Sequence, residues 1–349
     1  MLTTRLTERF AIPLPVMSAP MSLHSGGRLA AATSLAGGLG LFGATNPAGD
    51  DWLRGQIELA RSLCEDRPFG VGFITHLIPP LPTLFDVAIE MQVPVIAFSF
   101  ADPTPWIERA KKSGATVVCQ VQSAASAAEA VAAGADVLVA QGNEAGGHTG
   151  RANLMPLLGR VLDGYPDIPV LAAGGIASGR GLAAVLAAGA DGAWIGTALL
   201  ATHESDQVSD EYKQMIVDAR SEQTVYTEVF DILDQVAFGI PPWPDGIAGR
   251  AIANEFLAEW HGREDTLKAR LDDVLPAYQQ ALSAHDVART AVWAGESVDH
   301  VRSVRPVADV LRDICNEAER LLNDSRGASS TRRALPDDTR DSSGARPRP

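Results

Sequence analysis

Short apolar segments alternate with Ala-rich helical stretches along the first two hundred residues of the chain. The apolar segments contain few polar positions, as expected of parallel strands that are covered on both faces. They span residues 15–20, 39–44, 69–74, 93–100, 115–121, 136–142, 169–175 and 192–197, and helical stretches such as 27–36, 123–133 and 178–188 separate them. Strand–helix units at this spacing predict an α/β fold, a closed (β/α)8 TIM barrel, with an open doubly wound sheet as the alternative.

Residues 38–43, GLGLFG, match the G-x-G-x-x-G spacing of dinucleotide-binding folds. That fingerprint requires a strand before the glycines and a helix that begins within them. Here a helical pattern ends at Gly37 and Gly38, and a strand pattern begins. We therefore interpret the segment as a tight helix-to-strand turn and not as a dinucleotide site.

The pattern changes after residue 205. Helices are expected at 211–220, 248–260, 267–283 and from 307 to 322, separated by a segment that mixes aromatic residues, prolines and glycines. We interpret residues 1–205 as the barrel and 206–324 as a mainly helical cap that packs over the barrel mouth. Residues 325–349 are rich in Ser, Arg, Asp and Pro and poor in apolar residues, which predicts a disordered tail.

Composition narrows the function. The chain has 349 residues and a formal net charge of −14, which argues against a nucleic-acid partner because phosphate binding needs a basic face. Neither an apolar leader segment nor an uninterrupted apolar run of about 18 residues occurs, so neither a signal peptide nor a membrane span is expected. The three cysteines lie far apart without metal-binding spacing, as expected of reduced thiols in a cytoplasmic protein. The sequence leaves open whether the protein forms a homo-oligomer.

Candidate chemistry follows from the barrel, because its active site forms at the carboxyl ends of the strands and the last two loops often bind a phosphate. The seventh strand ends in Ala173, Gly174 and Gly175, and the eighth in Gly196 and Thr197. Residues without side chains let backbone N–H groups approach phosphate oxygens closely. Phosphate binding is favoured here over tight turns alone, although the pattern does not identify the ligand.

The following helix offers a further anion contact. Ser178 is placed to cap its first turn, whose positive end would point at the anion, and Arg180 in that turn either adds charge or is solvated.

Polar residues follow the other strands. His148 lies in the glycine-rich loop after the sixth strand, where it either reaches a substrate and moves a proton near neutral pH or is an exposed loop residue. Gln120 and Gln141 lie near the ends of the fifth and sixth strands, as ligand contacts or as amides satisfied within the protein. Pro20 restrains the loop after the first strand.

These segments together resemble the nitronate monooxygenase family, in the motifs PVMSAPMS, GADVLVAQGNEAGGHTG and IPVLAAGGIASGRGLAAVLAAGADGAWIGT. The resemblance covers residues 10–205 well and continues more weakly beyond them. It implies an FMN cofactor and a substrate contact from His148. The residues that it implies for FMN are Ala19, Pro20, Met21, Gln120, Gln141, Gly146, Gly147, Ala173, Gly174, Gly175, Gly196 and Thr197.

One position departs from the family. Gly72 stands where the family commonly has Asn, which removes one flavin contact or opens space near the ring. The leading hypothesis is oxidation of an alkyl nitronate by O2 to a carbonyl compound and nitrite. The alternatives are an NAD(P)H-dependent flavin reductase of a quinone or enoyl thioester, and a barrel that binds a phosphate ligand without redox chemistry.

Overall fold

Eight parallel strands form the barrel that the sequence predicts. The computed structural model describes residues 2–332, with side chains described up to residue 325. The strands are β1 (Val16–Ser18), β2 (Gly40–Gly43), β3 (Phe69–Ile74), β4 (Val95–Ser99), β5 (Thr116–Val121), β6 (Val137–Gln141), β8 (Val170–Ala173) and β9 (Gly192–Ile195). They pair in the order β1-β9-β8-β6-β5-β4-β3-β2. A parallel bridge between Met17 and Leu39 joins β1 to the start of β2 and closes the barrel.

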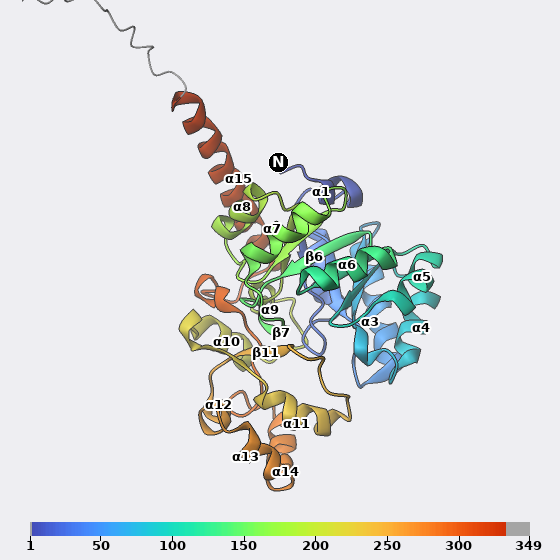
Figure 1. Ribbon diagram of the computed structural model, residues 1–349, viewed down its shortest axis with the longest axis vertical. Helices are drawn as coiled ribbons and strands as arrows, with labels where there is room; N and C mark the ends of the chain where they lie inside the picture. Colours follow the sequence, from blue (N-terminus) through green and yellow to red (C-terminus); the bar gives the residue numbers. More distant parts are fainter. Residues whose placement is uncertain (1, 333–349) are drawn as a thin grey trace, which may run out of the picture.

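Helices surround the strands (Figure 1). They are α2 (Gly27–Leu35), α3 (Gly49–Cys64), α4 (Pro82–Glu90), α5 (Thr104–Lys112), α6 (Ala124–Ala133), α7 (Leu154–Gly164) and α8 (Gly179–Ala187). Local sequence sets their ends: Ser123 caps the start of α6 through a capping box, and Gly134 ends it in the left-handed conformation. The GLGLFG segment forms the turn and strand β2, as the sequence indicates.

The barrel interior is filled with apolar side chains and is closed at the amino ends of its strands. Met17, Leu41 and Val139 belong to this inner cluster, and helix α1 (Arg5–Phe10) packs Leu6 and Phe10 into it. The guanidinium of Arg5 holds helix α1 in place by donating two hydrogen bonds, of 2.9 and 2.7 Å, to the carboxylate of Asp191 at the start of β9. The opposite end of the barrel is therefore the end that is open to ligands.

The cap is mainly helical, with its own apolar core and a small sheet. Its elements are α9 (Thr197–Leu200), α10 (Asp210–Asp218), β10 (Thr224–Thr227), α11 (Val229–Phe238), β11 (Ala248–Ile252), α12 (Glu255–Trp260), α13 (Glu264–Ala269) and α14 (Leu271–Ser283). Strand β11 pairs antiparallel with β10 on one side and with β7 (Gly147–Thr149), from the barrel half, on the other. The predicted helix at 248–260 is wrong in its first part, because all five residues of β11 are buried between two strands. The predicted helix at 267–283 is interrupted at Arg270.

Helix α15 (Val307–Arg332) returns from the cap to the barrel. It packs against α8 and α2, far from the cap helices α12 to α14 (Figure 1). Its buried face, with Val307, Leu311 and Ala318, joins the core between strands and outer helices. The segment predicted as a cap therefore also contains the last barrel helix. The helix continues through residues 325–332, which were expected to be disordered, and residues 333–349 lie outside the described part of the chain.

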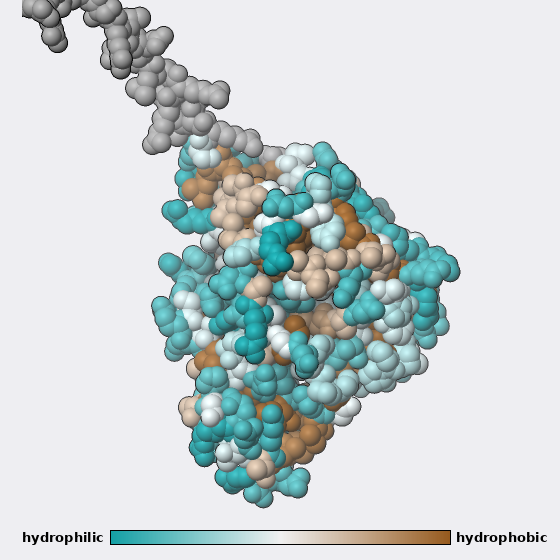
Figure 2. Space-filling view, viewed as in Figure 1, coloured by the Kyte–Doolittle hydropathy of each residue, from teal (hydrophilic) through white to brown (hydrophobic). Residues whose placement is uncertain are grey.

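The surface on the side that Figure 2 shows is mostly hydrophilic, with a hydrophobic area on the cap where α11 and α14 lie. None of the helices described between residues 2 and 332 has the length and apolar character needed to cross a membrane. The three cysteines, Cys64, Cys119 and Cys315, are buried and free.

Candidate active site

A cavity of about 500 Å³ opens at the carboxyl ends of the barrel strands, under the cap. This volume is within the range of about 300–1,000 Å³ that is typical of cofactor and ligand sites. The sequence-predicted residues all line this cavity: Ala19, Pro20, Met21, Gln120, Gln141, Gly146, Gly147, His148, Ala173, Gly174, Gly175, Gly196 and Thr197. The fold therefore brings residues from five strand ends into one site.

The ends of β8 and β9 form a cradle that lacks side chains. Gly174 and Gly175 have φ angles of 105° and 70°, which favour glycine, and neither Gly175 nor Thr197 uses its backbone N–H in a hydrogen bond within the described residues. A Cβ at Gly196 would lie 3.4 Å from Ala19 Cβ and 3.4 Å from Met21 Sδ. Free N–H groups in such a concave backbone are suited to an anionic phosphate.

The positive end of helix α8 does not contribute to this cradle. The Ser178 hydroxyl accepts a hydrogen bond from Gly181 N–H, as predicted, but the Gly179 N–H donates to Glu317 Oε2 of α15 at 2.9 Å. Arg180 is exposed and lies outside the lining of the cavity. The expectation that this helix end points at the ligand is therefore wrong, because a carboxylate from the last barrel helix already occupies it.

The two glutamines differ in what they offer. The Gln141 amide is satisfied within the protein: it accepts from Gln122 Nε2 and donates to the His148 carbonyl, each at 3.0 Å. The side-chain amide of Gln120 makes no hydrogen bond with the described residues, so it is free to contact a ligand in the cavity. Gln141 thus positions the loop that carries His148, and Gln120 offers a free amide to the cavity.

The absence of a side chain at position 72 has a steric explanation. A Cβ at this position would lie only 2.2 Å from Pro20 Cγ and 2.5 Å from Pro20 Cβ. An Asn, as is common in the family, would collide with the proline ring. The space is therefore filled by Pro20 rather than opened, and no amide reaches the cavity from this position.

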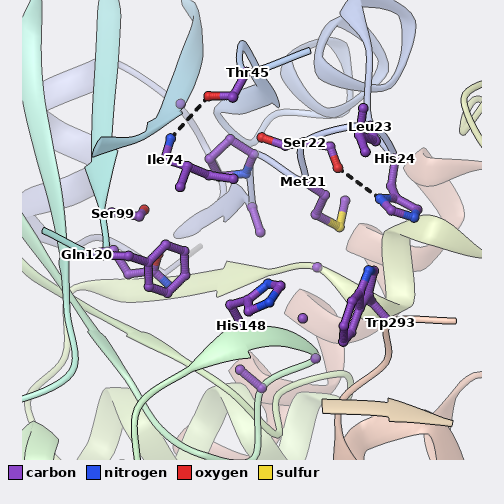
Figure 3. Close-up of a pocket in the computed structure, with 18 of the residues that line it drawn as sticks. Met21, Ser22, Leu23, His24, Thr45, Ile74, Ser99, Gln120, His148 and Trp293 are labelled. Atoms are coloured by element: carbon purple, nitrogen blue, oxygen red, sulfur yellow. Dashed lines mark hydrogen bonds between the residues drawn. The ribbon is translucent and has the colours of Figure 1, made fainter. Parts of the chain in front are cut away.

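His148 lies on β7, in register with Gly249 of β11, so the cap sheet holds its backbone. Its Nε2 lies 2.6 Å from Asp231 Oδ1 on α11. Its ring stacks on Trp243, with centroids 3.5 Å apart and planes at 14°. The Trp293 ring lies on another side with its centroid 5.0 Å away, and Figure 3 shows the rings of His148 and Trp293 at the cavity. Gly249 makes room for this packing, because a Cβ there would overlap the Trp293 ring.

Burial shifts the pKa values of three other groups at or near the cavity. It raises the pKa of the Asp234 carboxyl to about 7, against a hydrogen bond from the Tyr278 hydroxyl at 2.8 Å. Burial and the nearby His148 lower the pKa of His76 to about 4, and both ring nitrogens of His76 are buried without a partner. His24 also has a lowered pKa because of its burial, although its Nδ1 donates to the Ser22 carbonyl (Figure 3).

The sequence interpretation missed several residues that the cap contributes, among them Asp231, Asp234, Trp243 and Trp293. The only available signal was the unusual Pro- and Trp-rich segment around Trp243. The lining also lacks Lys and Arg among the described residues, so an anion in the cavity can be met only by backbone N–H groups, amides, hydroxyls and histidines.

The cavity lies at the carboxyl ends of the strands of a parallel barrel, where barrel enzymes have their active sites, and the family of this chain makes it a flavin-dependent oxidoreductase. A family model described as nitronate monooxygenase matches residues 3–79 and 82–317, and the chain belongs to this family.

Two solved structures and a curated relative show what the chain is similar to. FabK from Thermotoga maritima superposes with a TM-score of 0.81 at 33% identity, covering 94% of this chain and 100% of that one. The nitroalkane oxidase from Streptomyces ansochromogenes has a TM-score of 0.73 at 30% identity, covering 91% and 98%. The (3aS,4S,5R,7aS)-5-hydroxy-7a-methyl-1-oxo-octahydro-1H-indene-4-carboxyl-CoA dehydrogenase of Rhodococcus jostii (strain RHA1) is 40% identical over 214 residues. That alignment spans 60% of this chain and 60% of the dehydrogenase.

Proposed function

We propose that the protein binds FMN and oxidises alkyl nitronates with O2, releasing a carbonyl compound and nitrite. The observation that carries this proposal is the position of His148, which faces a small aromatic space in the same cavity as the phosphate cradle. The similarity to a nitroalkane oxidase over most of both chains supports the same substrate class.

The backbone cradle and the Gln120 amide fit FMN, because they can bind a phosphate and a flavin without a cationic side chain. The backbone at Gly175 and Thr197 would hold the phosphate, and Gln120 would contact the ring system or the ribityl chain. When it is bound, the flavin supplies the redox chemistry, and the protein supplies binding and orientation.

The residues above the cradle would select and hold the substrate. Phe100, Trp243 and Trp293 surround His148, so the space beside the imidazole suits a small organic group and excludes water. A nitronate carries a negative charge, and the lining offers neither Lys nor Arg to balance it. His148 would therefore donate the hydrogen bond that orients the nitro oxygens.

A second candidate is an NAD(P)H-dependent reductase that acts on a quinone or an enoyl thioester. The 40% identity to a carboxyl-CoA dehydrogenase favours a thioester substrate. The lining does not separate this candidate from the first, because it offers no Lys or Arg to a thioester or to a nitronate. Membership of a flavin-enzyme family disfavours the third hypothesis, a barrel without redox chemistry.

Anaerobic mixing of the purified flavoprotein with a pre-formed nitronate, or with NADH, separates the first two candidates. Bleaching of the flavin absorbance by the nitronate, followed by nitrite release when O2 is admitted, is the expected result. Rapid bleaching by NADH and none by nitronates would overturn the proposal in favour of the reductase.

A further inference from the structure

The cap supplies His148 with a buried carboxylate partner. His148 Nε2 and Asp231 Oδ1 are 2.6 Å apart, and the two side chains are 14% and 5% exposed. We infer that Asp231 is a positioning residue: it keeps a proton on Nε2 of His148, so that Nδ1 is the atom that exchanges a proton with the substrate. This role in turnover rests on the proposed function, whereas the position of the proton can be tested without turnover.

Hydrogen-bond chemistry assigns the proton. An ionised carboxylate can only accept, so the nitrogen that faces it must carry the hydrogen. In the neutral imidazole the other nitrogen, Nδ1, then has a free lone pair. Nδ1 has no hydrogen-bond partner among the described residues, and His148 lines the cavity.

The remaining contacts of His148 fix the ring and leave this edge available. Trp243 covers a face of the ring, Trp293 is tilted against it, and Gln141 holds its backbone carbonyl. The imidazole is therefore restrained in direction as well as in protonation, which proton transfer requires.

The Asp231 carboxylate depends on His148 for its hydrogen bonding. Its second oxygen, Oδ2, is buried without a partner, so the Nε2–H of His148 gives the only hydrogen bond that this carboxylate receives from the described residues. The other titratable groups near the pair are Asp234, one turn further along α11, and His76, beyond Trp243. Burial and the charge of Asp231 raise the pKa of Asp234, which keeps that neighbour neutral below about pH 7, and the lowered pKa of His76 keeps it neutral as well.

The Asp231–His148 pair would extend the proposed reaction to a neutral nitroalkane. Nδ1 takes the proton from the α-carbon, and the electron pair of the C–H bond passes into the nitro group, which yields the nitronate. The positive charge that forms on the imidazole is stabilised by Asp231. A substrate that arrives as the nitronate needs no proton removed from carbon, and it would receive a hydrogen bond from Nδ1 only when the imidazole carries both protons.

The position of the proton is tested first on the flavin-loaded protein without substrate. ¹⁵N NMR of histidine-labelled protein, with the His148 signals assigned from a His148→Gln variant, should show a protonated Nε2 and an unprotonated Nδ1 at alkaline pH. Asp231→Asn should shift the proton towards Nδ1, because the Asn amide can donate to Nε2. The matched control Asp234→Asn, one turn away, should leave the His148 tautomer unchanged. A proton on Nδ1 in the unmodified protein, or the same tautomer in Asp231→Asn, overturns the inference.

Kinetics test the role in turnover, with flavin content verified in each variant. Asp231→Asn should lower turnover of a neutral nitroalkane by roughly 10²-fold or more, as for the loss of an oriented acid–base group. Turnover of the pre-formed nitronate should fall by less than about tenfold, because no proton is removed from carbon. Equal losses with both substrates, or no loss with either, refute the positioning role. If the unmodified protein oxidises neither substrate, the proposed function fails, and the NMR result still decides where the proton lies.

Discussion

The pH dependence of the unfolding free energy measures how strongly burial disfavours the charged form of Asp234. Its carboxyl has a pKa raised from 3.8 to about 7, chiefly by burial. Because the folded state holds the proton more tightly than the unfolded state, the free energy of unfolding falls as the pH rises from about 4 to about 7 and is then constant. One pKa unit corresponds to about 1.4 kcal/mol, so the full effect is roughly 4 kcal/mol, of which roughly 3 kcal/mol develops between pH 5 and pH 8.

The side chain retains partial contact with solvent, so we expect about 2 kcal/mol in practice. Asp234→Asn removes the charge and keeps an acceptor for the Tyr278 hydroxyl. Relative to the unmodified protein, this variant should therefore gain about 2 kcal/mol of stability between pH 5 and pH 8, measured by urea unfolding at saturating flavin. The exposed Asp245, changed to Asn, is the control for the substitution itself. A stability difference that is the same at both pH values would refute the argument that the cavity holds Asp234 neutral.

The remaining predictions concern the flavin cradle and the aromatic space. Gly175→Val should yield protein with little bound flavin. The control Gly114→Val changes another left-handed glycine, with open space around it, and should lose only about 1–2 kcal/mol of stability while keeping its flavin. Equal flavin content in the two variants would contradict the role of Gly175 in binding the phosphate. Trp243→Ala should raise KM for a small nitronate about 2- to 10-fold, from the loss of about 0.5–1.5 kcal/mol of aromatic contact, and Trp243→Phe should largely restore it. His148→Ala should lower nitronate turnover by at least about tenfold with flavin still bound, and His148→Asn should retain part of it; an unchanged kcat/KM in the Ala variant would remove His148 from the reaction.

Local sequence predicted the barrel well because its strands and helices are specified within short windows. Apolar runs covered on both faces marked all eight strands, and caps such as Ser123 and Gly134 marked helix ends. The same regularity fixed which strand ends meet, so residues as distant as Pro20, Gln120 and Gly175 could be assigned to one site without a structure.

The cap was predicted less well for a physical reason. Ala248–Ile252 has no strong local preference, and it becomes a strand because β10 and β7 bury both of its edges. Helix α15 packs against the barrel helices α8 and α2. Its amphipathic pattern could not predict this, because an apolar face does not identify the element that will cover it.

The site shows the same division. The sequence by itself determined the glycine cradle, the histidine and the family, because each is a property of residues close together in the chain. Only the tertiary structure decided that Glu317 occupies the end of α8, that Pro20 fills the space beside Gly72 and that Asp231 meets His148. Each of these contacts joins residues about 50 to 140 positions apart, and its distance depends on how barrel and cap pack rather than on any local pattern.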